Sequence, residues 1–246
     1  MKADPQAQQR LLALQAVDTA LAQLAHRRDH LPELAELAEA DERLTTLRDD
    51  VVRAETEVSD LDREQKRVDR DVEQVRARAD KDRARLDSGA ASAKELEGLQ
   101  HEVESLARRQ TTLEDQELEV MERREEAEAA LAKARAELDS SDSSRAEIEA
   151  RRDKAFEEID SGRQTREEER KGIVGDIPAD LLALYDKVRA QQGGVGAAAL
   201  RQRRCEGCRI ELAGNELTDA RHAPADEVLR CENCRRILVR TPESGL

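Results

Sequence analysis

The sequence predicts a mainly α-helical protein, a long antiparallel two-helix coiled-coil hairpin that is followed by a small β domain. Three observations lead to this fold class. Apolar residues recur at alternating steps of three and four along two long, otherwise charged stretches. A short stretch between them carries residues that end one helix and start another. Near the C-terminus, two C-x-x-C pairs mark a separate module.

The composition disfavours an ordinary globular enzyme. Of 246 residues, 40% are charged and 1% are aromatic, namely Phe156 and Tyr185, whereas globular cores depend on large apolar side chains. The net charge of −14 argues against attraction of the whole chain to nucleic acid or anionic lipid. No apolar run approaches the ~20 residues that span a bilayer, and no apolar segment follows the initial Met1. We therefore expect a cytoplasmic protein without a membrane segment.

The helices are predicted in order from the apolar spacing. Apolar positions from Leu14 to Leu31 indicate a first helix. Pro32 should kink or briefly break it, because proline lacks a backbone N–H and clashes with the preceding turn. A first heptad seam runs from Leu44 to Leu86, with eleven of thirteen positions apolar, and a second runs from Leu96 to Ile159, with thirteen of nineteen apolar. The pattern weakens between Gly162 and Gly175, where we expect the helix to lose definition.

The stretch between the seams predicts a tight reversal. Gly89 suits the left-handed conformation that ends a helix, and Ser92 with Glu95 forms the capping box that starts the next one. Two arms of similar length on either side favour an antiparallel hairpin within one chain. The alternative is a parallel dimer of one uninterrupted helix, which the spacing alone permits because Leu86, Gly89, Ala93 and Leu96 keep the three-four step.

The only four cysteines form two C-x-x-C pairs that stand 22 residues apart. Two such turns aim four thiolates at one point, which is the ligand set of a structural zinc site without an open coordination position. Iron in a rubredoxin-like site is the main alternative metal, while disulfides are disfavoured in a cytoplasmic protein. His222 lies between the pairs and is interpreted as a surface residue. The predicted Zn²⁺ ligands are Cys205, Cys208, Cys231 and Cys234.

These signals divide the chain into two predicted domains. Residues 1–175 form the hairpin, with a kink near residue 32 and its tip near residues 88–92. Residues 176–246 form a short helix at 181–189 and a C4 zinc-ribbon domain with strands at 197–200 and 236–240.

Arginines crowd the cysteine pairs, and residues 201–240 carry a formal charge of +2 whereas residues 1–200 carry −15. Arginine forks suit bidentate contacts with a phosphate backbone, which indicates RNA or DNA binding. Alternatively, the arginines offset the charge of −2 on a zinc tetrathiolate, and this module has no aromatic residue for stacking on bases. The candidate nucleic-acid contacts are Arg201, Arg203, Arg204, Arg209, Arg235, Arg236 and Arg240.

The whole pattern resembles a bacterial family of coiled-coil hairpin proteins with a C-terminal C4-type zinc ribbon. The resemblance lies in residues 92–103, in residues 177–178 with the segment 193–197, and in the cysteine pairs with residues 235–238. It implies a long hairpin, one zinc site and an adaptor role, because characterised relatives bind RNA, an alternative sigma factor, or components of flagellar or secretion machinery. The family commonly has glycine after the fourth cysteine and an aromatic residue after Ile-Leu, where this chain has Arg235 and Val239.

The leading hypothesis is a non-enzymatic adaptor or regulator that binds nucleic acid through the ribbon and proteins through the coiled-coil arms. The alternative is a pure protein-interaction scaffold or chaperone-like adaptor whose ribbon is only structural. No nucleophile with a base and an orienting group is recognisable, so we expect neither catalysis nor a small-molecule substrate.

Overall fold

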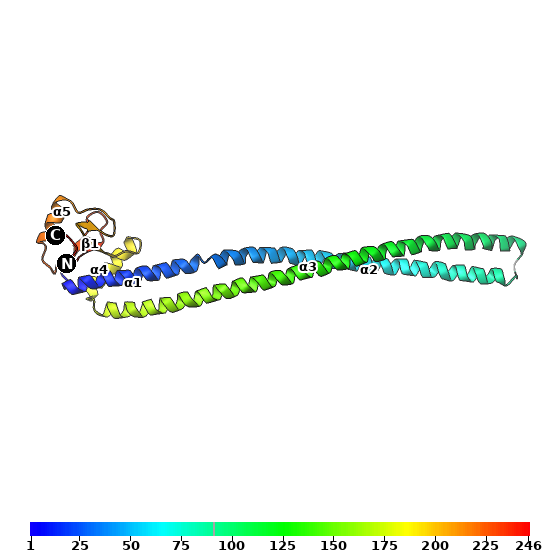
Figure 1. Ribbon diagram of the computed structural model, residues 1–246, viewed down its shortest axis with the longest axis horizontal. Helices are drawn as coiled ribbons and strands as arrows, with labels where there is room; N and C mark the ends of the chain where they lie inside the picture. Colours follow the sequence, from blue (N-terminus) through cyan, green and yellow to red (C-terminus); the bar gives the residue numbers. More distant parts are fainter. Residues whose placement is uncertain (91) are drawn as a thin grey trace. The chain divides into compact units, whose positions relative to one another are not determined.

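The computed structural model describes residues 1–90 and 92–246 (Figure 1), so Ala91 of the predicted tip lies outside the described residues. By packing, the chain divides into two compact units. One combines Met1–Leu34 with Ala150–Leu246, and the other is Ala35–Glu149. The domain boundary predicted at 175/176 follows the change in composition along the sequence and stays a prediction.

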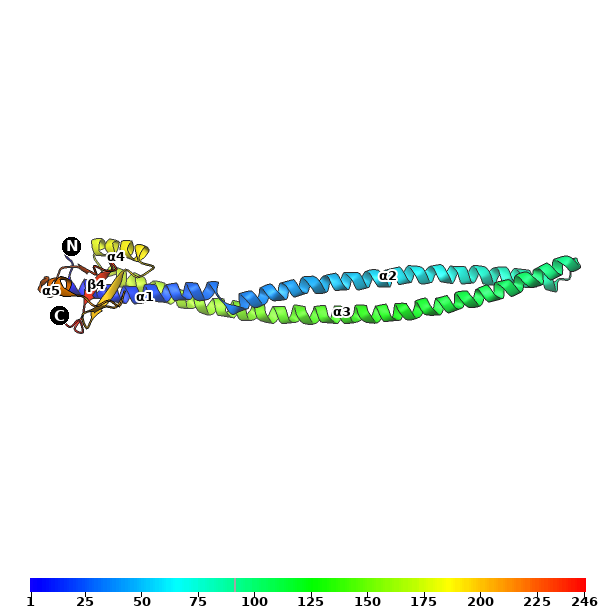
Figure 2. The ribbon, with the colours of Figure 1, turned by 90° about the horizontal axis from the view of Figure 1, so that it is seen from above.

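The unit Ala35–Glu149 is an antiparallel hairpin of α2 (Pro32–Asp87) and α3 (Ala93–Gly175), which run side by side in opposite directions (Figure 2). All thirteen seam positions of α2 and all nineteen of α3 are buried or half-buried. Interhelical ion pairs flank the seam, such as Arg76–Glu114 at 2.6 Å and Arg135–Glu55 at 2.7 Å. The antiparallel hairpin within one chain is thereby confirmed.

The reversal between the two helices uses the predicted chemistry. Gly89 has φ +61°, the left-handed region where a Cβ is unfavourable. The backbone N–H of Ser92 donates to Glu95 Oε2 at 2.8 Å, and the N–H of Glu95 lies 3.4 Å from Ser92 Oγ. Hydrogen bonds from the Ser92 hydroxyl and N–H lower the pKa of Glu95. The capping box is confirmed.

The other unit places α1 (Pro5–Asp29) beside the C-terminal part of α3. Asp4 caps α1 by accepting from the N–H of Gln6 at 2.7 Å. Helix α1 ends at Asp29 and α2 begins at Pro32, the residue at which the sequence predicts an interruption. Among the described residues, none of the helices combines the length and the hydrophobicity that crossing a membrane requires.

The expected loss of helix between Gly162 and Gly175 is wrong, because α3 continues through Gly175. Packing outweighs the low helix propensity of glycine here. Ile159 is buried one turn before Gly162, where a Cβ would lie at an ordinary contact distance of 3.6 Å from Leu24. The ion pair Arg163–Glu167, at 2.9 Å, adds support between successive turns.

The C-terminal part of this unit contains α4 (Ala179–Gln191), α5 (Gly214–His222) and a four-stranded sheet of order β2-β1-β4-β3. The strands are β1 (Ala197–Arg201), β2 (Arg204–Cys205), β3 (Leu229–Arg230) and β4 (Ile237–Arg240). β1 pairs with β4 in parallel, and the two outer strands pair antiparallel with their neighbours.

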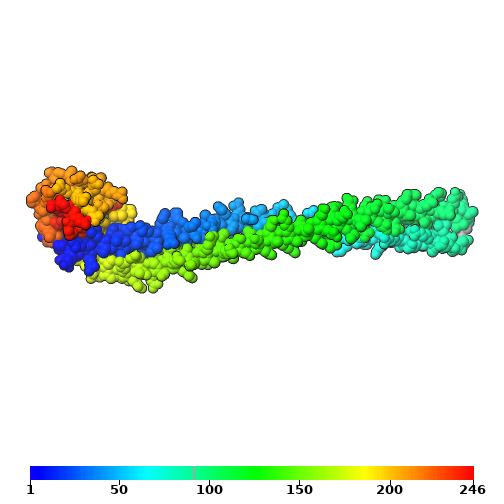
Figure 3. All heavy atoms as spheres, viewed as in Figure 1, coloured from blue at the N-terminus to red at the C-terminus, as the bar shows by residue number. Residues whose placement is uncertain are grey.

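The first residues of the chain pack against the ribbon, as the blue and orange-to-red surfaces at one end of Figure 3 show. The N–H of Ala3 donates to the carbonyl of Asp226 at 2.7 Å, and the N–H of Val228 donates to the carbonyl of Met1 at 3.0 Å. One apolar core joins α1, α4 and the sheet, and it includes Leu11, Leu14, Leu181, Tyr185, Ile237 and Val239.

Candidate metal centre and its arginine surface

The four predicted ligands lie together, and their sulfur atoms are all within 4.8 Å of one another. Cys205 and Cys231 are buried, whereas Cys208 and Cys234 are half-buried, and none of the four is in a disulfide. The sulfur atoms of Cys205 and Cys234 are 3.9 Å apart, and those of Cys208 and Cys231 are 3.8 Å apart. A tetrahedron with Zn–S bonds of ~2.3 Å has edges of about 3.8 Å, so the residues present fit a Zn²⁺ ion.

Each C-x-x-C pair folds into a knuckle with the same backbone hydrogen bonds. The N–H of Arg209 donates to the carbonyl of Cys205 at 2.7 Å, and the N–H of Arg235 donates to that of Cys231 at 2.8 Å. In each knuckle the N–H of the first cysteine also donates to the carbonyl five residues later. Cys205 donates to Ile210 and Cys231 donates to Arg236, both at 3.0 Å. This repeated turn brings the two sulfurs of each pair to the same side.

The thiols differ in their tendency to ionise. Burial raises the pKa of Cys205 and of Cys231. Burial acts in the same direction on Cys234, but hydrogen bonds from the backbone and side chain of Arg236 outweigh it and lower the pKa of that thiol. Because metals bind thiolates, loading the site releases protons from the two buried cysteines. A Zn²⁺ ion bound by all four sulfurs would have no position left for water or substrate, which is the arrangement of a structural site.

His222, which the sequence placed between the cysteine pairs, is not a member of the sulfur cluster. It is exposed at the last turn of α5, where its Nδ1 donates to the carbonyl of Thr218 at 2.8 Å. This position agrees with its interpretation as a surface histidine.

Two of the seven candidate arginines are engaged inside the fold, so we leave them out of the proposed binding surface. Arg236 donates to the carbonyls of Gln192, Val195 and Gly207 at 2.8–3.2 Å and so ties the α4 end, the linker and the first knuckle together. Arg240 donates to four carbonyls of the segment 223–227. Nucleic-acid contact by any of the seven stays a prediction.

The other five arginines are exposed. Arg201 pairs with Glu243 at 2.6 Å, and Arg203 donates to the carbonyl of Gly245 at 3.2 Å. The side chains of Arg204, Arg209 and Arg235 have no hydrogen bond or ion pair with any residue that the structure describes. We call these three residues the knuckle arginines.

Arg209 and Arg235 occupy an unusual backbone conformation directly after a ligand cysteine. Their φ angles are +61° and +62°, in the left-handed region that glycine adopts most readily. A side chain there costs roughly 1–2 kcal/mol because the Cβ crowds the following carbonyl. This explains physically why glycine is common after the fourth cysteine in the family that the sequence resembles.

Replacing Arg209 or Arg235 with glycine is therefore expected to stabilise the ribbon, by about 0.5–1 kcal/mol each after the greater freedom of glycine in the unfolded chain is counted. Hydrogen exchange of the β4 amides in the zinc-loaded, full-length protein measures this change. Arg204→Gly is the matched control. It lies in a strand, where glycine should destabilise by a similar amount, and equal signs for both kinds of variant would contradict the explanation.

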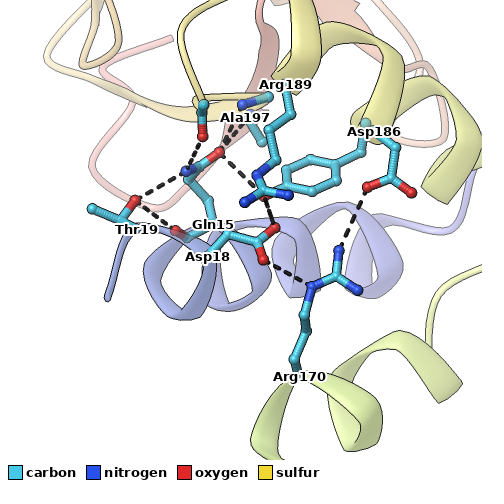
Figure 4. Close-up of polar contacts among 10 residues, drawn as sticks. Gln15, Asp18, Thr19, Arg170, Asp186, Arg189 and Ala197 are labelled. Carbon is cyan, nitrogen blue, oxygen red and sulfur yellow. Dashed lines mark hydrogen bonds and ion pairs between the residues drawn. The ribbon is translucent and has the colours of Figure 1, made fainter. Parts of the chain in front are cut away.

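A buried polar network lies beside the ribbon (Figure 4) and was not predicted from the sequence. Asp18 on α1 is 1% exposed and accepts from Tyr185 Oη at 2.7 Å and from Arg170 Nε at 2.8 Å. The guanidinium of Arg189 forms an ion pair with it at 3.3 Å. Burial and the hydrogen bond to Asp18 raise the pKa of Tyr185, so its hydroxyl remains a donor. The network joins α1, α3 and α4.

Gln15, one turn before Asp18, connects α1 to the linker that enters the sheet. Its side-chain nitrogen donates to the carbonyl of Gly194 at 3.1 Å, and its oxygen accepts from the N–H of Gly196 at 2.7 Å. The available signal was spacing, because residues 15 and 18 share the buried helix face of Leu11 and Leu14. Polar residues at apolar positions mark a buried network.

Comparison with known proteins agrees with both parts of the structure. Residues 14–193 match the CT398-like coiled coil hairpin domain, and residues 204–238 match the C4-type zinc ribbon domain. The chain belongs to the CT398-like hairpin family. An uncharacterized protein of Mycobacterium tuberculosis is 38% identical over 98% of both chains, and one of Mycobacterium leprae is 32% identical over 93% of this chain and 94% of its own.

Solved structures of similar proteins have the same fold. A protein from Mycobacterium smegmatis superposes with a TM-score of 0.86 at 38% identity, covering 98% of this chain and all of its own. CT398 from Chlamydia trachomatis has a TM-score of 0.68 at 22% identity, covering 96% and 98%, which shows a shared fold. A coiled-coil hairpin with a C4 zinc ribbon is thus the architecture of this family member.

Proposed function

We propose that the protein is a non-catalytic adaptor in the cytoplasm, with a ribbon that binds RNA or DNA and coiled-coil arms that bind other proteins. In this proposal one Zn²⁺ ion is held by the four cysteines and shapes the ribbon without taking part in chemistry. A closed thiolate site and a long helical hairpin support an adaptor, because they provide surfaces and no reaction centre.

The observation that carries the nucleic-acid part is the state of the knuckle arginines. All three are exposed and lack an intramolecular partner among the described residues. Two of them occupy backbone positions that glycine would stabilise. Cationic side chains at strained positions beside a rigid metal centre suit contacts with phosphates, which arginine binds through two parallel N–H donors.

The glycine variants provide a test in which loss of binding cannot be attributed to unfolding. We expect the double variant R209G/R235G to bind labelled single-stranded RNA and DNA oligonucleotides more weakly while its ribbon is more stable. Fluorescence anisotropy over a range of salt concentrations gives the affinity. Each lost phosphate contact on a single strand lowers the salt slope by about 0.7, so the slope should fall by about 1.4.

The matched control replaces two exposed arginines far along the coiled coil, R108A/R109A, whose side chains also lack partners among the described residues. Its affinity and salt slope should equal those of the wild type. Unchanged binding by R209G/R235G, or an equal loss in R108A/R109A, would exclude the knuckle arginines as the contact surface.

The second candidate function is a protein scaffold or chaperone-like adaptor with a purely structural ribbon. Ile210 favours it, since this apolar side chain is 48% exposed directly beside Arg209, where a protein partner could cover it. Nuclease treatment separates the two functions. Partners that stay bound to the full-length protein after nuclease favour the scaffold, and partners that are released favour nucleic-acid binding.

A further inference from the structure

Leu118 and Met121 are the two exposed large apolar side chains of α3 among the described residues, and they lie within one helix turn of each other. Leu118 is 60% exposed and Met121 is 38% exposed. Among the described residues, seven large apolar side chains are exposed, and these are the only two that share a helix turn. Leucine and methionine at this spacing form a small continuous apolar surface, and methionine adapts its shape to a partner.

Acidic side chains surround this pair on the same outward face. Helical spacing places 115, 118, 119, 122, 125 and 126 along one stripe, with Met121 at its flank. We call this stripe the 115–126 face, and it extends over about 17 Å of helix. Its five carboxylates are exposed and have no hydrogen bond or ion pair with the described part of the chain; they are Asp115, Glu119, Glu122, Glu125 and Glu126.

The two nearest cations are directed away from this face. Arg123 pairs with Glu64 on α2 at 3.5 Å. Arg124 pairs with Asp62 on α2 at 3.1 Å and with Glu128 at 2.8 Å. Elsewhere on the hairpin, arginines pair with carboxylates across the seam. Here Arg123 and Arg124 pair with carboxylates of α2, which leaves the five carboxylates of the 115–126 face uncompensated. All of the net charge of −14 falls within residues 35–149.

We propose that the 115–126 face docks a basic amphipathic helix of another protein. This inference rests on the proposed protein-binding role of the arms and locates it. Charge complementarity selects the occupant, since five carboxylates repel a nucleic acid and attract lysine and arginine. To cover Leu118 and Met121, the partner must present leucine-like side chains one helix turn apart. An amphipathic helix that lies along α3 presents side chains at this spacing.

The probe is a fluorescent peptide of about 18 residues made of lysine and leucine, with leucines at i, i+3, i+4 and i+7 so that they form one face. A scrambled peptide of identical composition has no apolar face. We expect the full-length, zinc-loaded protein to bind the amphipathic peptide more tightly than the scrambled one. L118Q/M121Q should weaken binding about tenfold, as truncation of central apolar contacts does, and E122K/E125K should weaken it and reduce its salt dependence.

V52Q/D49K is the matched control, because Val52 is 58% exposed on α2 beside the exposed Asp49 and should leave binding unchanged. Equal binding of the two peptides, full affinity in L118Q/M121Q, or an equal loss in V52Q/D49K would each overturn the proposal. Nucleic-acid binding by the ribbon is measured separately on the same variants. Failure of the docking face leaves that result intact, so the two failures are distinguishable.

Discussion

Replacing Cys205 with serine is expected to abolish tight zinc binding and to unfold the ribbon while the coiled coil remains folded. The core around the cysteines consists of small and aliphatic side chains only, including Ala198, Leu200, Leu212 and Leu238. Such a core is too small to order the module without the metal, whose binding contributes roughly 10–16 kcal/mol of apparent free energy in small zinc modules. We expect hydrogen-exchange protection to be lost over the two knuckles and the segment between them, residues 204–236, and kept over 35–149. Strands β1 and β4 also belong to the apolar core with α1 and α4, so they should lose less protection.

The zinc content of the purified protein, measured by mass spectrometry of the metal, should fall from one ion per chain to nearly none in C205S. His222→Ala is the matched control, since this histidine lies between the cysteine pairs but outside the sulfur cluster. It should retain its zinc and its exchange protection. Full zinc content in C205S, or loss of zinc in H222A, would contradict the assignment of the four cysteines as the complete ligand set.

The coiled coil and the sulfur cluster were predictable because each depends on spacing alone. A three-four repeat forces apolar side chains onto one stripe, and every predicted seam position is buried or half-buried. The sulfur cluster was predictable because it requires only that the two C-x-x-C turns lie close together. The error between Gly162 and Gly175 arose because local propensity was weighed without the packing against Leu24, which keeps the helix intact.

The roles of individual arginines could not be read from the sequence. Arg235 and Arg236 are neighbours with the same chemistry, yet one is exposed without a partner among the described residues and the other donates to three carbonyls. That difference depends on where the linker and the first knuckle lie in space. Composition near a metal site therefore indicates a basic surface but overstates the number of arginines that are free to bind.

Outside the metal site, replacing Asp18 should lower the stability of the fold more than any of the other substitutions. Its carboxylate is buried, accepts from Tyr185 and pairs with Arg170 and Arg189, whose side chains are 30% and 32% exposed. Asp18→Ala removes the carboxylate that pairs with both guanidinium groups and accepts from Tyr185 Oη at 2.7 Å. Arg170 keeps Asp186 at 3.5 Å, and Tyr185 Oη keeps Gln15 Oε1 at 3.3 Å, so the loss falls most heavily on Arg189. Breaking a buried ion pair costs roughly 3–5 kcal/mol, and we expect about 3 kcal/mol because water reaches both arginines.

Native-state hydrogen exchange of the α1 and α4 amides measures the effect of Asp18→Ala locally, which avoids assuming that the whole chain unfolds in one step. Asp29→Ala is the matched control on α1, since this exposed aspartate should change stability by less than about 0.5 kcal/mol. Tyr185→Phe removes a single hydrogen bond and should cost roughly 1–2 kcal/mol. If Asp18→Ala and Asp29→Ala behaved alike, the network would not hold α1 against α4, and the docking of the ribbon module would depend on the apolar core alone.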